Sequence, residues 1–145
     1  MLGRRRADLE ILDQALLGLR RFFDTPGVLD DQGRRVELST LLVLDAIGVD
    51  GASVREVAQR LDVAHSTASR LVKRAEEAGM VFRGNSTLDA RETVVAATEA
   101  GRELGRRALG FRLGRLVELT RDWSPHELET FAASLRLFAR RVTGE

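Results

Sequence analysis

One stretch near the middle of the chain carries side chains that could contact nucleic acid. Two short hydroxyls, Ser66 and Ser69, are followed by three cations, Arg70, Lys73 and Arg74. On a helical wheel of about 100° per residue, Ser66, Arg70 and Lys73 point away from the apolar side, and the other two flank them. Hydroxyls can reach base edges or phosphates, and a guanidinium can bind guanine or phosphate in a bidentate manner. The pattern favours DNA binding, with a solvated helix face as the alternative.

A pair of short helices must hold these side chains. Ser53 and Glu56 have the spacing of a capping box, which satisfies backbone N–H groups at a helix start. Apolar residues follow at helical spacing, broken at residues 62–64: Val54, Val57, Ala58 and Leu61, then Ala68, Leu71, Val72 and Ala75. Gly79 ends the second helix where a left-handed residue is favoured. This is the pattern of a helix-turn-helix, whose second helix can enter a DNA major groove.

A β-hairpin is predicted directly after the second helix. Residues 80–83 and 93–97 read as strands, joined by the polar loop 84–92. A hairpin in this position is a wing. We expect its tip to carry Arg83 and Arg91, where a cation could enter a narrow A·T-rich minor groove. An ordinary exposed loop charge is the alternative.

Composition excludes several classes of function. The 145-residue chain has a formal net charge of +1, so a DNA-binding surface must be local. Cysteine is absent, which excludes disulfides, thiolate metal sites and thiol redox switches. His65 and His126 are the only histidines and fall in separate predicted elements, and the sequence has no phosphate-binding glycine-rich loop. We therefore expect no enzymatic activity, no cofactor and no metal.

The sequence also indicates a cytoplasmic protein. Its longest apolar runs, such as residues 41–44, are far too short to cross a bilayer. The arginines at the start resemble a signal peptide's basic region, but Asp8, Glu10 and Asp13 interrupt the apolar stretch that would have to follow.

Long amphipathic helices are predicted at both ends of the chain. Apolar residues repeat with spacings of 3 and 4 in each: Leu9, Leu12, Leu16, Leu19 and Phe23, and then Leu128, Phe131, Leu135, Phe138 and Val142. A further helix should run from Thr98 to about Asp122. The two stripes could form a core between the terminal helices, or pack across a two-fold dimer, which we favour. A dimer would place two recognition helices ~34 Å apart and predicts a pseudo-palindromic site.

The fold class that follows is mainly α with a small β-hairpin wing, a winged helix-turn-helix flanked by dimerisation helices. We expect an N-terminal dimerisation helix and loop at residues 1–36 and the DNA-binding domain at 37–100. The C-terminal dimerisation helices would then occupy residues 101–145.

The order of these predicted helices and of the hairpin resembles that of the MarR family of bacterial transcriptional regulators. The motifs that carry the resemblance are REVAQRL at 55–61, STASRLVKRAEEAGMV at 66–81, Asp89-x-Arg91 in the wing, and Ala97-Thr98-Glu99-Ala100-Gly101. The resemblance implies a winged-helix homodimer that regulates transcription, as a repressor, from a pseudo-palindromic DNA operator. Members often release DNA on binding a small aromatic compound in a cleft, for which this sequence assigns no residues. The alternative is a winged-helix protein–protein interaction module that does not bind DNA.

The resemblance also assigns contacts to individual residues. It implies that Arg91 enters the minor groove, held by an ion pair with Asp89, and that Arg55 contacts a phosphate. Two positions depart from the family: Asp62 replaces an elbow glycine, and Ala64 replaces a serine cap worth about 1 kcal/mol. The predicted DNA-binding set is Arg55, His65, Ser66, Thr67, Ser69, Arg70, Lys73, Arg74, Arg83, Asp89 and Arg91.

Overall fold

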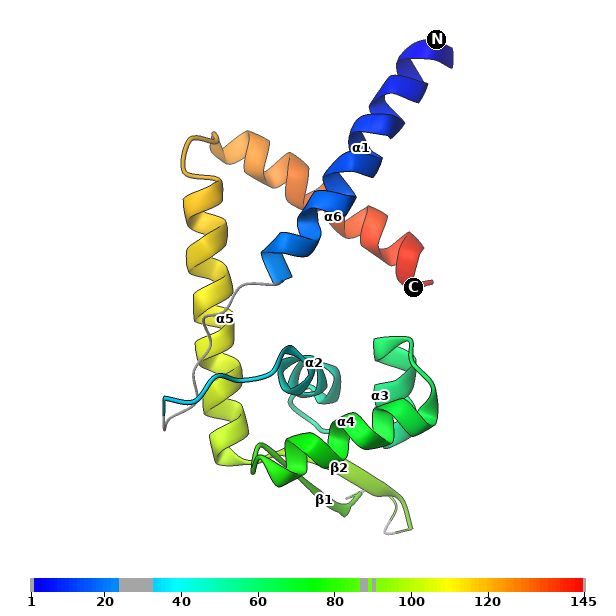
Figure 1. The fold of residues 1–145 in the computed structure, drawn as a ribbon, viewed down its shortest axis with the longest axis vertical. Helices are drawn as coiled ribbons and strands as arrows, with labels where there is room; N and C mark the ends of the chain where they lie inside the picture. The colour runs from blue at the N-terminus through cyan, green and yellow to red at the C-terminus, as the bar shows by residue number, and fades with distance from the viewer. Residues whose placement is uncertain (1, 24–32, 87–88, 90, 145) are drawn as a thin grey trace. The chain divides into compact units, whose positions relative to one another are not determined.

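The computed structural model describes residues 2–23, 33–86, 89 and 91–144, and the chain divides into two compact units, Met1–Ala108 and Leu109–Glu145. The elements are α1 (Leu2–Phe23), α2 (Leu38–Ile47), α3 (Val54–Leu61), α4 (His65–Glu77), β1 (Val81–Asn85), β2 (Thr93–Ala97), α5 (Glu99–Leu119) and α6 (Pro125–Thr143) (Figure 1). Helix α5 begins in the first unit and continues into the second. The predicted fold class, mainly helical with a hairpin wing, is confirmed.

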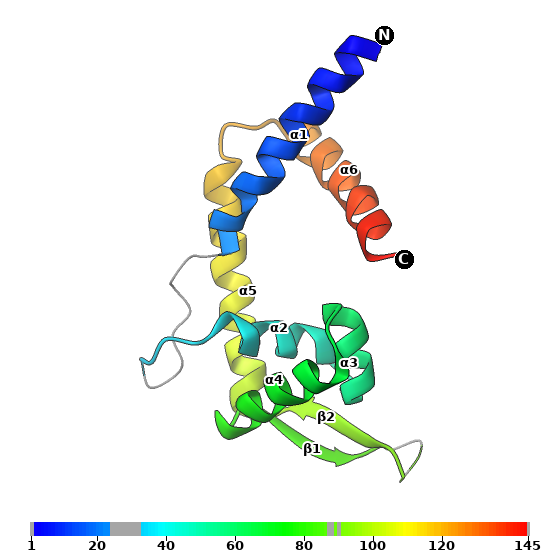
Figure 2. The same ribbon diagram turned by 45° about the vertical axis from the view of Figure 1, so that its right-hand side comes forward.

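The core of the first unit lies between α2, the α3–α4 pair and the hairpin (Figure 2). Its residues are small and aliphatic: Val43, Ala46, Ile47, Ala52, Val57, Ala58, Ala68, Val72, Ala75, Val81 and Val95. They come from one side of each helix, as the helical spacing predicts. The opposite side of α4 therefore faces solvent.

The helix-turn-helix forms as its local sequence predicts. The Ser53 hydroxyl accepts a hydrogen bond from the Glu56 N–H at 3.1 Å, completing the capping box of α3. Asp62 adopts the left-handed conformation with φ 52°, which an aspartate tolerates better than most side chains. Gly79 also has positive φ, at 75°. Ala64 provides no side-chain cap for α4, so the loss of that acceptor is confirmed.

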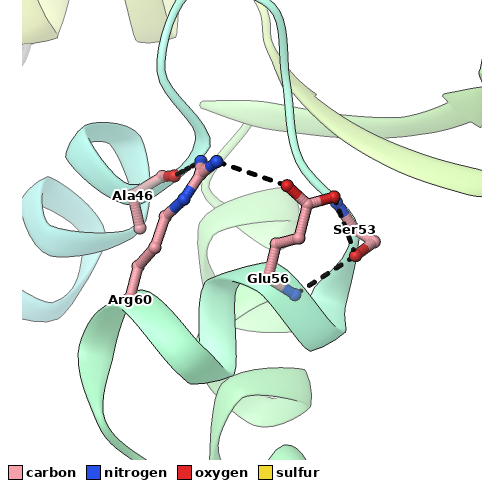
Figure 3. A network of polar contacts seen from close by, with 4 residues as sticks. All are labelled: Ala46, Ser53, Glu56 and Arg60. Carbon is pink, nitrogen blue, oxygen red and sulfur yellow. Dashed lines mark hydrogen bonds and ion pairs between the residues drawn. The ribbon is translucent and has the colours of Figure 1, made fainter. Parts of the chain in front are cut away.

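Arg60 extends this capping box into a tie between α3 and α2 (Figure 3). Its Nη1 donates to the carbonyl oxygen of Ala46, near the end of α2, and its Nη2 lies 3.2 Å from the Glu56 carboxylate. The last carbonyls of a helix lack partners within the helix. The guanidinium therefore satisfies the end of α2 while it pairs with the start of α3.

We predict that Arg60→Met lowers the free energy of unfolding by about 1–2 kcal/mol, because the charge-assisted hydrogen bond to Ala46 is lost while the aliphatic stem is kept. Urea denaturation followed by circular dichroism measures the change. Arg106→Met is the matched control, since Arg106 is 73% exposed and pairs with Glu103 in the same helix. Its expected effect is within about 0.5 kcal/mol. Equal effects of the two substitutions would contradict a stabilising role for the tie.

The wing is an antiparallel pair with a short third element. Strands β1 and β2 align Val81 with Ala97 and Asn85 with Thr93. Ala52, between α2 and α3, adds an isolated bridge to Val95, with N–O distances of 3.0 and 2.8 Å. The sequence did not predict this bridge. It anchors the base of the wing to the segment that leads into the helix-turn-helix.

The start of α5 is fastened to the end of α4. The Thr98 hydroxyl accepts from the Gly101 N–H at 3.0 Å and donates to the Gly79 carbonyl at 2.7 Å. Thr98 therefore caps α5, as predicted. The helix ends at Leu119, a few residues before the predicted end near Asp122.

The terminal helices α1 and α6 keep their apolar stripes exposed. In α1, Leu9, Leu12, Leu16 and Leu19 are 45–56% exposed. Helix α6 contains no buried residue, and its stripe of Leu128, Phe131, Leu135 and Phe138 is 43–48% exposed. Within its own unit, each stripe therefore stays exposed. The side chain of Phe23 lies outside the described residues.

The N-terminus of α6 has a second capping box. Ser124 Oγ accepts from the Glu127 N–H at 3.3 Å, and the Ser124 N–H donates to Glu127 at 2.8 Å. The hydrogen bonds that the Ser124 backbone N–H and hydroxyl donate to the carboxylate lower the pKa of Glu127 below its ordinary value. Trp123 packs edge-on against Phe131, with ring centroids 5.2 Å apart. Among the described residues, no helix has the length and apolarity to span a membrane.

Candidate nucleic-acid interface

The outer face of α4 carries the candidate DNA contacts. Burial of Ala68, Val72 and Ala75 fixes the orientation of the helix. The opposite side then exposes hydroxyl and basic side chains, while two further hydroxyls are partly buried beside them. The exposed members are His65, Ser66, Arg70, Lys73 and Arg74, and the partly buried ones are Thr67 and Ser69. The structure therefore brings together seven of the predicted site residues on one element.

The cations of this face are held only loosely. Arg70 Nη2 lies 3.5 Å from the Thr67 hydroxyl, at the limit of a hydrogen bond. Arg74 Nη1 lies 4.0 Å from the Glu37 carboxylate, and both side chains are about two-thirds exposed. Ion pairs this exposed are worth little and exchange readily with other partners. The guanidinium groups can therefore turn to an approaching phosphate without a large loss of folding stability.

The wing differs from its prediction in two respects. Arg83 is not at the hairpin tip: it lies in the middle of β1 opposite Val95, and its Nε is 3.5 Å from the Glu76 carboxylate. The strand runs on to Asn85, two residues beyond the predicted end, which moves Arg83 away from the loop. Its charge ties the wing to α4.

The predicted ion pair between the side chains of Asp89 and Arg91 is also wrong, because Asp89 contacts the backbone of Arg91 instead. The Asp89 carboxylate accepts from the backbone N–H of Arg91 at 2.9 Å, and these two side chains form no ion pair with each other. Such a local turn is typical of aspartate in a tight loop. The carboxylate thus shapes the loop, and the exposed Arg91 guanidinium is left to reach outward.

Arg55 and Asp89 complete the predicted set. Arg55 is exposed in the first turn of α3, where the helix N-terminus favours an approaching anion. The sequence analysis did not predict two ion pairs made by residues of this set, that of Arg74 with Glu37 and that of Arg83 with Glu76. No local signal could have found them, because each joins elements separated in the sequence. Within the described residues, no cluster of metal-ligating side chains is found.

Comparison with known proteins gives a consistent result. Residues 36–92 match the MarR family. The uncharacterized HTH-type transcriptional regulator YxaD of Bacillus subtilis is 29% identical over 112 residues, which span 74% of this chain and 78% of YxaD.

Solved structures share the fold. A MarR family protein from Bacillus stearothermophilus superposes with a TM-score of 0.75 at 21% identity, over 99% of both chains. Streptococcus pneumoniae FabT in complex with DNA has a TM-score of 0.66 at 16% identity, over 98% of this chain and 97% of FabT. CouR from Rhodococcus jostii, bound to p-coumaroyl-CoA, has a TM-score of 0.62 at 25% identity, over 74% of each chain.

Proposed function

We propose that this protein binds double-stranded DNA sequence-specifically. The match of residues 36–92 to the MarR family, the similarity to the regulator YxaD and the fold shared with a MarR family protein support this proposal. The single observation that carries the proposal is the outer face of α4. It presents hydroxyls and three cations on a helix whose other side is anchored in the core. Arg70 and the hydroxyls would read base edges, while Lys73, Arg74 and Arg55 would bind phosphates.

The protein acts on DNA as a homodimer in this proposal. Support comes from the exposed apolar stripes of α1 and α6, since contiguous apolar surface of this kind marks an interface. Two-fold symmetry would make the operator pseudo-palindromic, and occupation of the operator would repress transcription.

A small aromatic molecule would release the DNA. The support is the 25% identical CouR, which was solved with p-coumaroyl-CoA. Titration of the protein–DNA complex with a panel of aromatic acids tests this part, and unchanged DNA affinity throughout the panel would count against it.

Selection from a random DNA pool, followed by affinity measurements at two salt concentrations, tests the main proposal. We expect a pseudo-palindrome with half-sites about one turn apart and an affinity that falls steeply with salt, because each phosphate contact releases counterions. A folded dimer that enriches no sequence would overturn the proposal and favour the protein–protein interaction module.

A further inference from the structure

Arg83 lies on the face of the wing that is turned toward the core. In β1 it is directly opposite Val95, and residues opposite each other in an antiparallel pair point to the same side. Val95 is buried, and so is Val81, two residues before Arg83 on the same face of β1. A charge in this position needs a partner nearby. The partner is Glu76 of α4, which runs beside β1 (Figure 2): the Arg83 Nε lies 3.5 Å from its carboxylate.

This ion pair is shorter and better shielded from solvent than the pair of Arg74 with Glu37. The side chains of Arg83 and Glu76 are 35% and 41% exposed. Those of Arg74 and Glu37 are 66% and 67% exposed, and their charged atoms lie 4.0 Å apart. Charges that are partly shielded from solvent are screened less by salt. The Glu76–Arg83 pair can therefore hold β1 against α4, whereas the looser pair exchanges its partners readily.

The position of Glu76 is unfavourable for a carboxylate without such a partner. Glu76 lies in the last turn of α4, where the negative end of the helix dipole disfavours an acidic side chain. The same helix presents the cations proposed to bind DNA, and an unpaired carboxylate beside them would repel phosphates. Pairing with Arg83 offsets both effects. The contact thus joins the helix that would read the major groove to the wing.

The wing is held from its other edge at the same level. Arg83 and Val95 form one rung of the hairpin, and Val95 exchanges two backbone hydrogen bonds with Ala52. Two more rungs follow before the loop that carries Arg91. Arg91 is four residues from Val95, about 13 Å along an extended chain, so a tilt of about 10° at this rung would move it by about 2 Å. A minor groove is only about 6 Å wide, so such a tilt would change what Arg91 can reach.

We propose that the Glu76–Arg83 ion pair fixes the angle of the wing to α4, and thereby the position at which Arg91 enters the minor groove. Glu76 and Arg83 are positioning residues, because they act on DNA through Arg91. Their role in DNA binding rests on the proposed function. It adds one property to the operator: an A·T-rich segment at a fixed distance outside the bases that α4 reads, since narrow A·T-rich grooves attract arginine.

The affinities of the parent and of Glu76→Gln for two DNAs test this role. One DNA is the selected operator, and in the other the flanking A·T pairs are changed to G·C. We expect the parent to prefer the operator by about tenfold and Glu76→Gln to prefer it by about twofold. The ratio of the two affinities is compared, because loss of a carboxylate strengthens binding to any DNA. Glu77→Gln is the matched control: it makes the same change of charge at the neighbouring exposed residue of α4 and should discriminate like the parent.

Reversal of the ion pair distinguishes positioning from a general loss of structure. The double variant Glu76→Arg/Arg83→Glu keeps the net charge and should restore most of the preference for the A·T flank. A fold that is merely weakened would bind both DNAs less tightly and keep their ratio, and thermal melting of each variant verifies folding. Discrimination by Glu76→Gln equal to that of the parent would overturn the proposal, as would a parent that is indifferent to the flank.

A distance measurement without DNA separates the failure of this role from the failure of the proposed function. The chain has no cysteine, so spin labels attach only at introduced sites, Gln59→Cys on α3 and Thr93→Cys at the far end of β2. Double electron–electron resonance on labelled chains diluted with unlabelled ones gives the distance distribution within one chain. We expect a narrow distribution in the labelled parent and with Glu77→Gln, and a broader one with Glu76→Gln. An unchanged distribution would overturn the proposal, whereas a broadened one in a protein that binds no DNA would support the contact and refute the proposed function.

Discussion

Replacing Gly101 with alanine is expected to destabilise the winged helix by about 3 kcal/mol. A Cβ at this position would lie 2.0 Å from the Met80 carbonyl oxygen and 3.2 Å from a methyl carbon of Leu44. The carbonyl cannot easily move away, because it also accepts the Thr98 N–H at 3.0 Å at the junction of β2 and α5. Thermal and urea denaturation of the full chain measure the loss.

Gly105→Ala is the matched control for this prediction. It makes the same chemical change one turn further along α5, where a Cβ would meet no atom within 4 Å. Alanine has the higher helix propensity, so this variant should gain about 0.5–1 kcal/mol. A loss of stability in Gly101→Ala together with a gain in Gly105→Ala would establish that close packing at Gly101 causes the loss. A stable Gly101→Ala protein would mean that α5 can shift away from the base of the wing.

Removing the guanidinium of Arg70 is expected to have the largest effect on DNA binding. Arg70→Ala should weaken binding to the selected operator by about tenfold or more, and should relax the sequence preference at one position of each half-site. Folding should be unaffected, because Arg70 is exposed and, among the residues that the structure describes, has only the 3.5 Å contact with Thr67. Anisotropy titrations with the operator and with single-base variants measure both effects.

Comparison with Lys73→Ala shows whether the Arg70 effect is specific. A lysine that contacts only phosphate should weaken binding to all sequences alike and lower the dependence of affinity on salt. Arg106→Ala, on α5, controls for the loss of one positive charge. If Arg70→Ala bound and discriminated like the parent, α4 would not be the element that reads the operator.

Most of the fold was predictable because its signals are local. Each of these signals acts within a few residues: the capping boxes at Ser53 and Ser124, the positive φ of Gly79, and the helical spacing of apolar positions in α3 and α4. The ends of elements were less predictable. Strand β1 extends to Asn85 because Gly84 and Asn85 find partners in β2, and pairing across a hairpin overrides the local preference of these two residues for a turn.

The main element of the candidate site could be predicted from the sequence. The predicted positions and contacts of some of its residues were wrong. The α4 face follows from helical periodicity alone, whereas the positions of Arg83 and Asp89 depend on strand length and loop geometry. The hydrogen bond by which Arg60 joins α3 to α2 could not be predicted. It forms where separate segments of the chain meet, and a single arginine carries no sequence pattern that indicates such a contact.

Lys73 provides a single lysine side chain that can be labelled for spectroscopy. It is the only lysine in the sequence, and it is exposed on the outer face of α4. Amine-selective chemistry therefore has one side-chain target, on the surface proposed to meet DNA. Reductive methylation with isotope-labelled formaldehyde would install one NMR probe there and keep the positive charge. The arginines, which are the other cationic side chains at neutral pH, would stay unmodified, so contact at α4 could be observed without introducing a foreign residue.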